Sequence, residues 1–239
     1  MPSERNFSVV LSCEHATNFV PAAYRHLFAG REAVLSSHRG WDPGTLELGR
    51  AFTCKLQAPL FVAPVSRLLV EVNRSVGHRR LFSEFSSGLA PAEQKRLLSQ
   101  YYFPHRNAVE AAIRAEVAKK KQVLHLSLHS FTPVLGEDHR RADVGLLYDP
   151  KRIGEREFSS RWISALRDLR SELIIRRNYP YLGTADGFTT YLRRHFPQQF
   201  YWGIELELNQ RFWLNHRSQY KSLVQALTNS LANCIWNRI

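Results

Sequence analysis

The chain has 239 residues, and its content of 44% hydrophobic and 12% aromatic residues is enough to bury a core, so a single domain over residues 1–239 is expected and global disorder is excluded. The formal net charge of +12 is spread along the chain without a recognisable nucleic-acid-binding motif, which disfavours nucleic acid as a partner. No apolar stretch reaches the roughly 18 to 20 residues of a membrane span and no signal-peptide pattern opens the chain, so we expect a cytoplasmic protein that does not bind membranes.

Hydrophobic runs alternate with helical patterns along the chain. In the first half, strands are expected at residues 7–12, 59–63 and 67–72, and helices at 44–56 and 91–121. Pro104 is expected to kink or divide the last of these helices. In the second half, strands are expected at 123–128, 144–148, 173–176 and 201–208, and helices at 158–169, 186–195 and 216–239. This alternation favours an α/β sheet with helices on both faces, and such sheets bind ligands at the carboxyl ends of their strands.

The stretch "SVVLSCEHATNFVP" ends the first expected strand in three reactive side chains. His15 can bind a metal ion, and Glu14 can bind it as well or orient the imidazole ring. A histidine that only caps the junction of strand and loop is the alternative. Cys13 is expected to be a buried, reduced thiol, because the three cysteines are too widely spaced to form a disulfide framework or a zinc knuckle.

Asp42 lies between His38 and an expected helix in "SSHRGWDPGTLELG". It can be the N-cap residue of that helix, with Pro43 at the first helical position. It can equally supply a carboxylate oxygen to a metal ion. Local sequence leaves both interpretations open.

The segment "SRLLVEVNRS" places two arginines around an extended run. Arg74, with Asn73 beside it, and Arg67 offer the charged, forked hydrogen bonds that hold a substrate carboxylate. For either arginine alone, a surface ion pair is the alternative.

In "VLHLSLHSFTP", polar residues alternate with leucines, so His125, Ser127 and His129 share one face of a strand. His129 lies where the strand is expected to end, which makes it the better candidate for a metal ligand. His125 lies deeper and is expected to be a core or supporting group.

Glu205 and Glu207 lie two residues apart on one face of a late strand. Burial of an ionised carboxylate requires a compensating cation, metal ion or hydrogen-bond donor. A general base beside a metal-bound water would meet that requirement. Pairing of both carboxylates with basic surface residues is the alternative.

Taken in order, "SCEHATNFVP", "HRGWDPGTLELG", "SRLLVEVNRS", "LSLHSFTP", "RADVGLLYD", "NYPYLG" and "GIELELNQ" resemble the N-formylglutamate amidohydrolase family from about Val9 to Arg211. The resemblance implies a zinc-carboxypeptidase-like (phosphorylase/hydrolase-like) fold, in which a mixed, mostly parallel sheet lies between helices.

The same resemblance implies roles for particular residues. "LSLHSF" is similar to the strand that supplies the last zinc-binding histidine of carboxypeptidases, which implies His129. "GIELEL" is similar to the strand that carries their catalytic glutamate, which favours Glu205 over Glu207. "VEVNRS" is similar to the pair that holds a substrate carboxylate, which implies Asn73 and Arg74.

One position departs from that pattern. Carboxypeptidases use His-x-x-Glu for their first two ligands, whereas Asn18 follows His15 at this spacing. The second ligand is therefore open between Glu14, Asn18 and Asp42, with Asp42 ranked first. Glu71 stands where related sequences tend to have aspartate.

The resemblance implies a metal-dependent amidohydrolase of amino-acid metabolism that cleaves the linear amide of a small, anionic N-formyl or N-acyl amino acid such as N-formylglutamate. A divalent metal ion, zinc in the first instance, is expected on His15, Asp42 and His129. Glu205 is expected to transfer the proton.

Three alternatives remain. A ligand-binding family member without turnover is suggested by the departure at Asn18, and an amidase for short peptide-like substrates would use the same groups. A hydrolase with Cys13 or Ser130 as nucleophile is disfavoured, because neither residue lies in a nucleophile-elbow sequence.

Overall fold

The computed structural model describes residues 7–236 and contains a six-stranded sheet with the strand order β2-β1-β3-β8-β6-β7. The strands are β1 (Phe7–Cys13), β2 (Leu60–Val62), β3 (Gln122–Phe131), β6 (Val144–Leu147), β7 (Ile175–Arg177) and β8 (Tyr201–Asn209). Neighbouring strands are parallel except at the pairing of β6 with β8, which is antiparallel. The expected mixed, mostly parallel sheet is confirmed.

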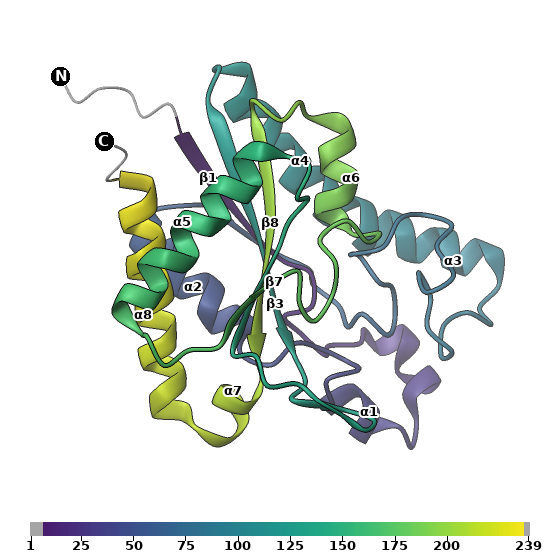
Figure 1. Ribbon diagram of the computed structural model, residues 1–239. Coiled ribbons are helices and arrows are strands. Elements are labelled where there is room, and N and C mark those ends of the chain that lie inside the picture. Colours follow the sequence, from purple (N-terminus) through teal and green to yellow (C-terminus); the bar gives the residue numbers. More distant parts are fainter. Residues whose placement is uncertain (1–6, 237–239) are drawn as a thin grey trace.

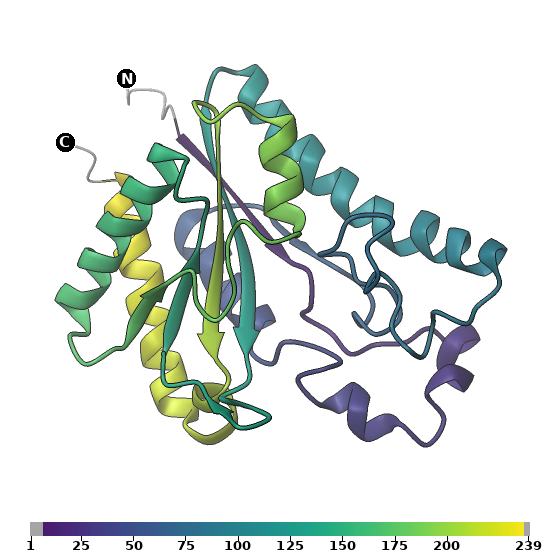
Figure 2. The ribbon, with the colours of Figure 1, turned by 45° about the vertical axis from the view of Figure 1, so that its right-hand side comes forward.

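Helices cover both faces of this sheet (Figures 1 and 2). One face carries α2 (Thr45–Leu56), α5 (Ile153–Leu169) and α8 (Arg217–Trp236), and the other carries α4 (Phe103–Ala118) and α6 (Phe188–His195). Among residues 7–236, no helix combines the length and apolar character needed to cross a bilayer.

Short elements join these layers. They are a 3₁₀-helix (Ala22–Phe28), α1 (Glu32–Ser36), α3 (Pro91–Leu97), a π-helical turn (Leu98–Tyr102), α7 (Arg211–Asn215) and a hairpin of β4 (Val134–Leu135) with β5 (Asp138–His139). The π-helical turn divides the long helical segment just before Pro104, as expected from the proline. The final helix was expected at 216–239; it begins at Arg217, and residues 237–239 lie outside the described part of the chain.

The strand expected at residues 67–72 is wrong. The segment is a buried loop in which the carbonyl of Ser66 accepts the backbone N–H groups of Leu69 and Val70, and Glu71 N–H donates to the carbonyl of Leu81. Its apolar residues pack in a separate cluster with Tyr24, Phe28 and Leu97. Burial beside the sheet, rather than pairing within it, therefore explains the hydrophobic run.

Alternation along β3 places the site on the face covered by α4 and α6. Leu124, Leu126 and Leu128 pack in the core beneath α2, α5 and α8, so Ser127 and His129 point to the opposite face. The strand continues to Phe131, three residues beyond the expected end, and therefore still holds His129 in the sheet.

Candidate functional site

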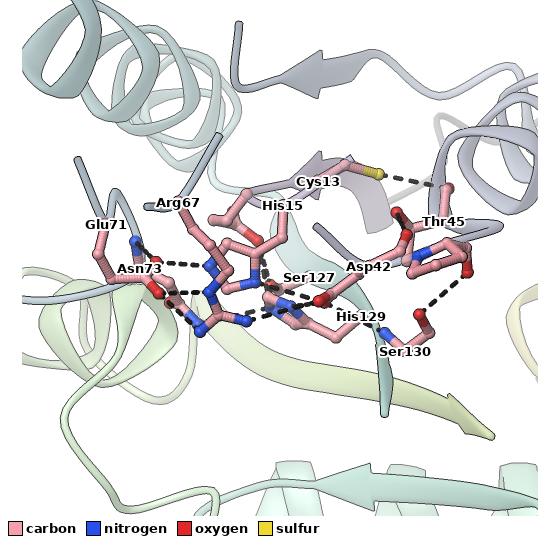
Figure 3. Close-up of polar contacts among 12 residues, drawn as sticks. Cys13, His15, Asp42, Thr45, Arg67, Glu71, Asn73, Ser127, His129 and Ser130 are labelled. Carbon is pink, nitrogen blue, oxygen red and sulfur yellow. Dashed lines mark hydrogen bonds and ion pairs between the residues drawn. The ribbon is translucent and has the colours of Figure 1, made fainter. Parts of the chain in front are cut away.

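His15 follows the carboxyl end of β1 and is buried between two carboxylates (Figure 3). Its Nδ1 lies 3.3 Å from Oδ2 of Asp42, and its Nε2 lies 2.5 Å from Oε1 of Glu71. The backbone N–H of Asp42 donates to the carbonyl of His15, which ties the two loops together. Both nitrogens of this imidazole therefore have acidic neighbours.

Asp42 faces the two histidines and does not cap α2. The helix begins at Thr45, and the residue before it, Gly44, has φ of +90°, a left-handed conformation that glycine adopts without strain. The N-cap interpretation is therefore wrong, because Gly44 and not Asp42 is the N-cap residue. The left-handed conformation of Gly44 turns the chain before the helix begins. The carboxylate of Asp42 is free to meet His15 and His129.

His129 completes the group from β3. Its Nδ1 lies 3.1 Å from Oδ2 of Asp42, and its ring centroid lies 4.9 Å from that of His15. One ligand atom from each of these three buried residues lies within 4.8 Å of the other two. Two imidazoles and one carboxylate are a donor set that suits zinc and several other divalent ions, so these residues fit a metal ion.

Glu14 lies behind His129, away from the shared oxygen of Asp42. Its Oε2 accepts a hydrogen bond from Ser127 Oγ at 2.6 Å and lies 3.3 Å from Nε2 of His129, and its Oε1 lies 3.6 Å from Nε2 of His105. This contact pattern is that of a carboxylate that orients an imidazole. Asn18, the other alternative ligand, is not among the residues that line the cavity described below.

The acidic and basic groups of the site shift one another's pKa values. Burial alone would raise the pKa of Asp42, but His15, His129 and Arg67 outweigh it and hold the pKa well below its usual range. Burial would likewise lower the pKa of His129, yet its contacts with Asp42 and Glu14 raise the pKa overall. The carboxylate of Asp42 therefore stays ionised, as binding of a cation requires.

The two arginines expected to hold a substrate differ in the partners that they already have within the protein. Arg67 donates to Glu71 at 2.8 Å and reaches Asp42 at 3.5 Å, so its charge already has two partners. Arg74 donates to the backbone carbonyl of Asp186. Asn73 accepts the backbone N–H of Phe188 on Oδ1 and directs Nδ2 towards His129.

The two glutamates of β8 lie beside the histidine strand. Glu205 is in register with Ser127, and Glu207 is in register with His129. Glu205 accepts a hydrogen bond from Thr189 Oγ1 at 2.6 Å, whereas Oε2 of the buried Glu207 has no hydrogen-bond partner among the described residues. Burial raises the pKa of Glu207 to about 8, although His129 opposes the shift.

Most of the residues proposed from the sequence line one cavity of about 190 Å³, whereas Glu14, Asn18 and Cys13 do not. The proposed residues that line it are His15, Asp42, Arg67, Asn73, Arg74, His129, Glu205 and Glu207. His38 also lines it, while the buried His125 bonds to Ser12 and Tyr201 and supports the core, as expected. The thiol of Cys13 is likewise buried and faces the carbonyl of Thr45.

Sequence reasoning missed several residues that line the cavity or contact the residues that line it. Glu71 contacts His15, and Thr189 bonds to Glu205 from α6. Tyr181, Leu182 and Asp186 line the cavity from the loop before α6. For Glu71, the signal was its place four residues after Arg67, a spacing that can form an ion pair. Tyr181 and Leu182 lie in the motif "NYPYLG", to which the sequence analysis assigned no role.

Comparison with known proteins agrees with this architecture. The structure is similar to the gene product Atu2144 of Agrobacterium tumefaciens, with 27% identity, a TM-score of 0.78 and coverage of 95% of this chain and 91% of the other. It has the fold of the N-formylglutamate amidohydrolase of Ralstonia eutropha JMP134, with 18% identity, a TM-score of 0.70 and coverage of 99% and 96%. No curated protein matches the sequence. The family model for N-formylglutamate amidohydrolase matches residues 7–214, and the chain therefore belongs to that family.

Proposed function

We propose that this protein is a metal-dependent hydrolase that cleaves the amide bond of a small N-formyl or N-acyl amino acid. The observation that carries the proposal is the convergence of His15, Asp42 and His129, with ligand atoms within 4.8 Å of one another, in a cavity that also contains two glutamates. Membership of the amidohydrolase family supports the reaction class, and N-formylglutamate is the first substrate to test.

His15, Asp42 and His129 would hold the ion, which is zinc in the first instance. When bound, a divalent ion would polarise the amide carbonyl and lower the pKa of water by many units, towards about 7. Glu71 and Glu14 would keep the two imidazole rings oriented, because each lies against the ring nitrogen that faces away from Asp42. Burial of all five side chains would exclude bulk water from this shell.

Glu205 would act as the general base, taking a proton from the attacking water and passing it to the leaving nitrogen. Its carboxylate lines the cavity, and the hydrogen bond from Thr189 holds one oxygen in place while the other stays available. Glu207 is the alternative base, since its side chain lies beside His129 and has an oxygen without a hydrogen-bond partner among the described residues.

Asn73 and Arg74 would hold the substrate's carboxylate. Both line the cavity, and among the described residues the guanidinium of Arg74 donates only to backbone carbonyls, those of Asn73 and Asp186, so its charge is available to an anion. Arg67 would add a second contact while its Nε and Nη2 remain paired with Glu71.

The decisive experiment combines metal analysis with an activity assay. Protein purified without added zinc should contain close to one divalent ion per chain and should release formate from N-formylglutamate or a related N-formyl amino acid. The double variant His15→Ala, His129→Ala should lose the ion and the activity together. Full activity in metal-free protein would exclude the proposal, and tight binding without turnover would point to a ligand-binding protein instead.

A further inference from the structure

Three of the side chains that line the cavity are apolar or aromatic and exposed. Leu135 from β4 is 45% exposed, and Tyr181 and Leu182 from the loop before α6 are 49% and 63% exposed. All three line the same cavity as His15 and His129. Apolar surface that gathers at a polar site, rather than being scattered singly, indicates contact with an apolar part of a ligand.

Leu182 is held over the cavity by the glycine that follows it. Gly183 N–H donates to Asn178 Oδ1 at 3.0 Å, and its carbonyl accepts hydrogen bonds from Arg193 and Thr190. A Cβ atom at this position would lie 2.2 Å from the backbone nitrogen of Tyr148, so the loop packs directly on the end of β6. The backbone next to Leu182 is therefore fixed, and the leucine side chain stands exposed at the cavity.

Tyr181 joins this loop to the β4-β5 hairpin. The buried Arg140 donates to its hydroxyl at 3.3 Å and lies over its ring, with 5.3 Å between the guanidinium carbon and the ring centroid. The backbone N–H of Arg140 donates to the carbonyl of Pro133, just before β4. The apolar rim is thus one connected unit.

The apolar rim offers no charged partner to a second substrate carboxylate. The side chains of Leu135 and Leu182 have no polar atom, and the hydroxyl of Tyr181 already accepts a hydrogen bond from Arg140. A carboxylate on the substrate's side chain would lose its water there without gaining a partner, at an energetic cost.

We propose that the preferred substrates are N-acyl amino acids with one carboxylate and an apolar side chain, and that Leu182 is the residue that selects them. The assignment rests on the proposed function. Arg74 would hold the carboxylate, and the apolar side chain would lie against Leu182, with Leu135 and Tyr181 around it. Dicarboxylic substrates such as N-formylglutamate would be turned over less efficiently.

The test compares kcat/KM for N-formylleucine, N-formylglutamate and N-formylglycine, the last of which has no side chain. The wild-type protein should prefer N-formylleucine. Leu182→Ser should lower kcat/KM for N-formylleucine about tenfold, the order of magnitude for a lost apolar contact, and leave N-formylglycine unchanged. The matched control Leu169→Ser changes an exposed leucine at the end of α5, outside the cavity, and should change neither value.

Binding measured by calorimetry separates this inference from the proposed function. A wild-type preference for N-formylglutamate, or an equal loss for all three substrates in Leu182→Ser, would overturn the inference and leave the hydrolase intact. Tighter binding of N-formylleucine without turnover of any substrate would uphold the inference and overturn the proposed hydrolysis. Failure to bind or turn over any of the three would overturn both.

Discussion

Glu71 lies 2.5 Å from Nε2 of His15, on the side of the imidazole ring opposite Asp42. One histidine is therefore held between two carboxylates, and Arg67 bonds to Glu71 and fixes its position (Figure 3). A carboxylate behind a metal-binding imidazole sets its tautomer and orientation. In the proposed metal centre, Glu71 would act on the ion only through His15.

Replacement of Glu71 should weaken metal binding without abolishing it. Glu71→Gln should lower the affinity for zinc by about 10- to 100-fold, because a neutral amide oxygen is a weaker acceptor for His15 than the carboxylate and carries no charge to make the imidazole more basic. Competition with a chelating dye measures this affinity. Glu84→Gln is the matched control, since Glu84 is exposed and pairs with Arg39 at the surface. Equal zinc affinity in both variants would show that Glu71 does not support a metal ligand.

The fold class could be predicted from the sequence because strand and helix periodicities are local signals. The expected strands of β1, β3, β6 and β8 appear within a few residues of their expected ends. The prediction of a strand at residues 67–72 failed because a buried loop and a buried strand can have the same run of hydrophobic residues. Periodicity does not report whether a segment's backbone pairs with a sheet or with another loop.

The candidate site was predictable in part for a topological reason. His15 follows β1 and His129 lies near the carboxyl end of β3, and the carboxyl ends of such parallel neighbouring strands meet at one edge of the sheet. Asp42 reaches them through the turn at Gly44, a conformation that the sequence allowed but did not specify. The contact between Glu14 and His129 depends on side-chain direction after the strand ends, which local sequence does not determine.

The second ligand can be assigned by comparing two carboxylates. We expect Asp42→Asn to lose the metal ion at stoichiometric zinc, because both histidines share Oδ2 of Asp42. Glu14→Gln should still bind one ion per chain, though more weakly, because Glu14 contacts the opposite nitrogen of His129. Elemental analysis after dialysis measures the stoichiometry. Loss of the ion in Glu14→Gln alone would make Glu14 the ligand.

Removal of the proposed base should separate activity from metal binding. Glu205→Gln should lower kcat by about a hundred- to ten-thousandfold, the usual contribution of a general base, and keep the metal content of the wild type. Steady-state kinetics and elemental analysis on the same preparation check both statements. A larger loss of kcat in Glu207→Gln than in Glu205→Gln would transfer the role to Glu207.

Arg74 should matter for substrate binding more than for the ion. Arg74→Met retains the apolar stem and removes the charge, so KM should rise by roughly 10- to 100-fold if a charge-assisted contact worth about 1.5–3 kcal/mol is lost. Metal content should stay the same. Arg79→Met alters an exposed arginine that does not line the cavity and serves as the control. A loss of metal with no change in KM would argue against a substrate-binding role.

The buried carboxyl of Glu207 should make the stability of the metal-free protein depend on pH. Burial raises its pKa in the folded state to about 8, from an ordinary value of 4.5. Between these values the folded protein keeps a proton that the unfolded chain has released. The contribution to the free energy of unfolding is therefore fully present below about pH 4.5 and is lost as pH rises towards 8.

Comparison of the wild type with Glu207→Gln isolates this contribution, because the amide does not titrate and the other groups are common to both proteins. Each pKa unit corresponds to about 1.4 kcal/mol, so the wild type should lose on the order of 3 to 5 kcal/mol relative to the variant between pH 4.5 and 9. Urea unfolding of chelator-treated protein at several pH values measures the difference. Parallel pH profiles for the two proteins would mean that Glu207 is already ionised in the folded state, and the carboxyl would then need a cationic partner to remain buried beside His129.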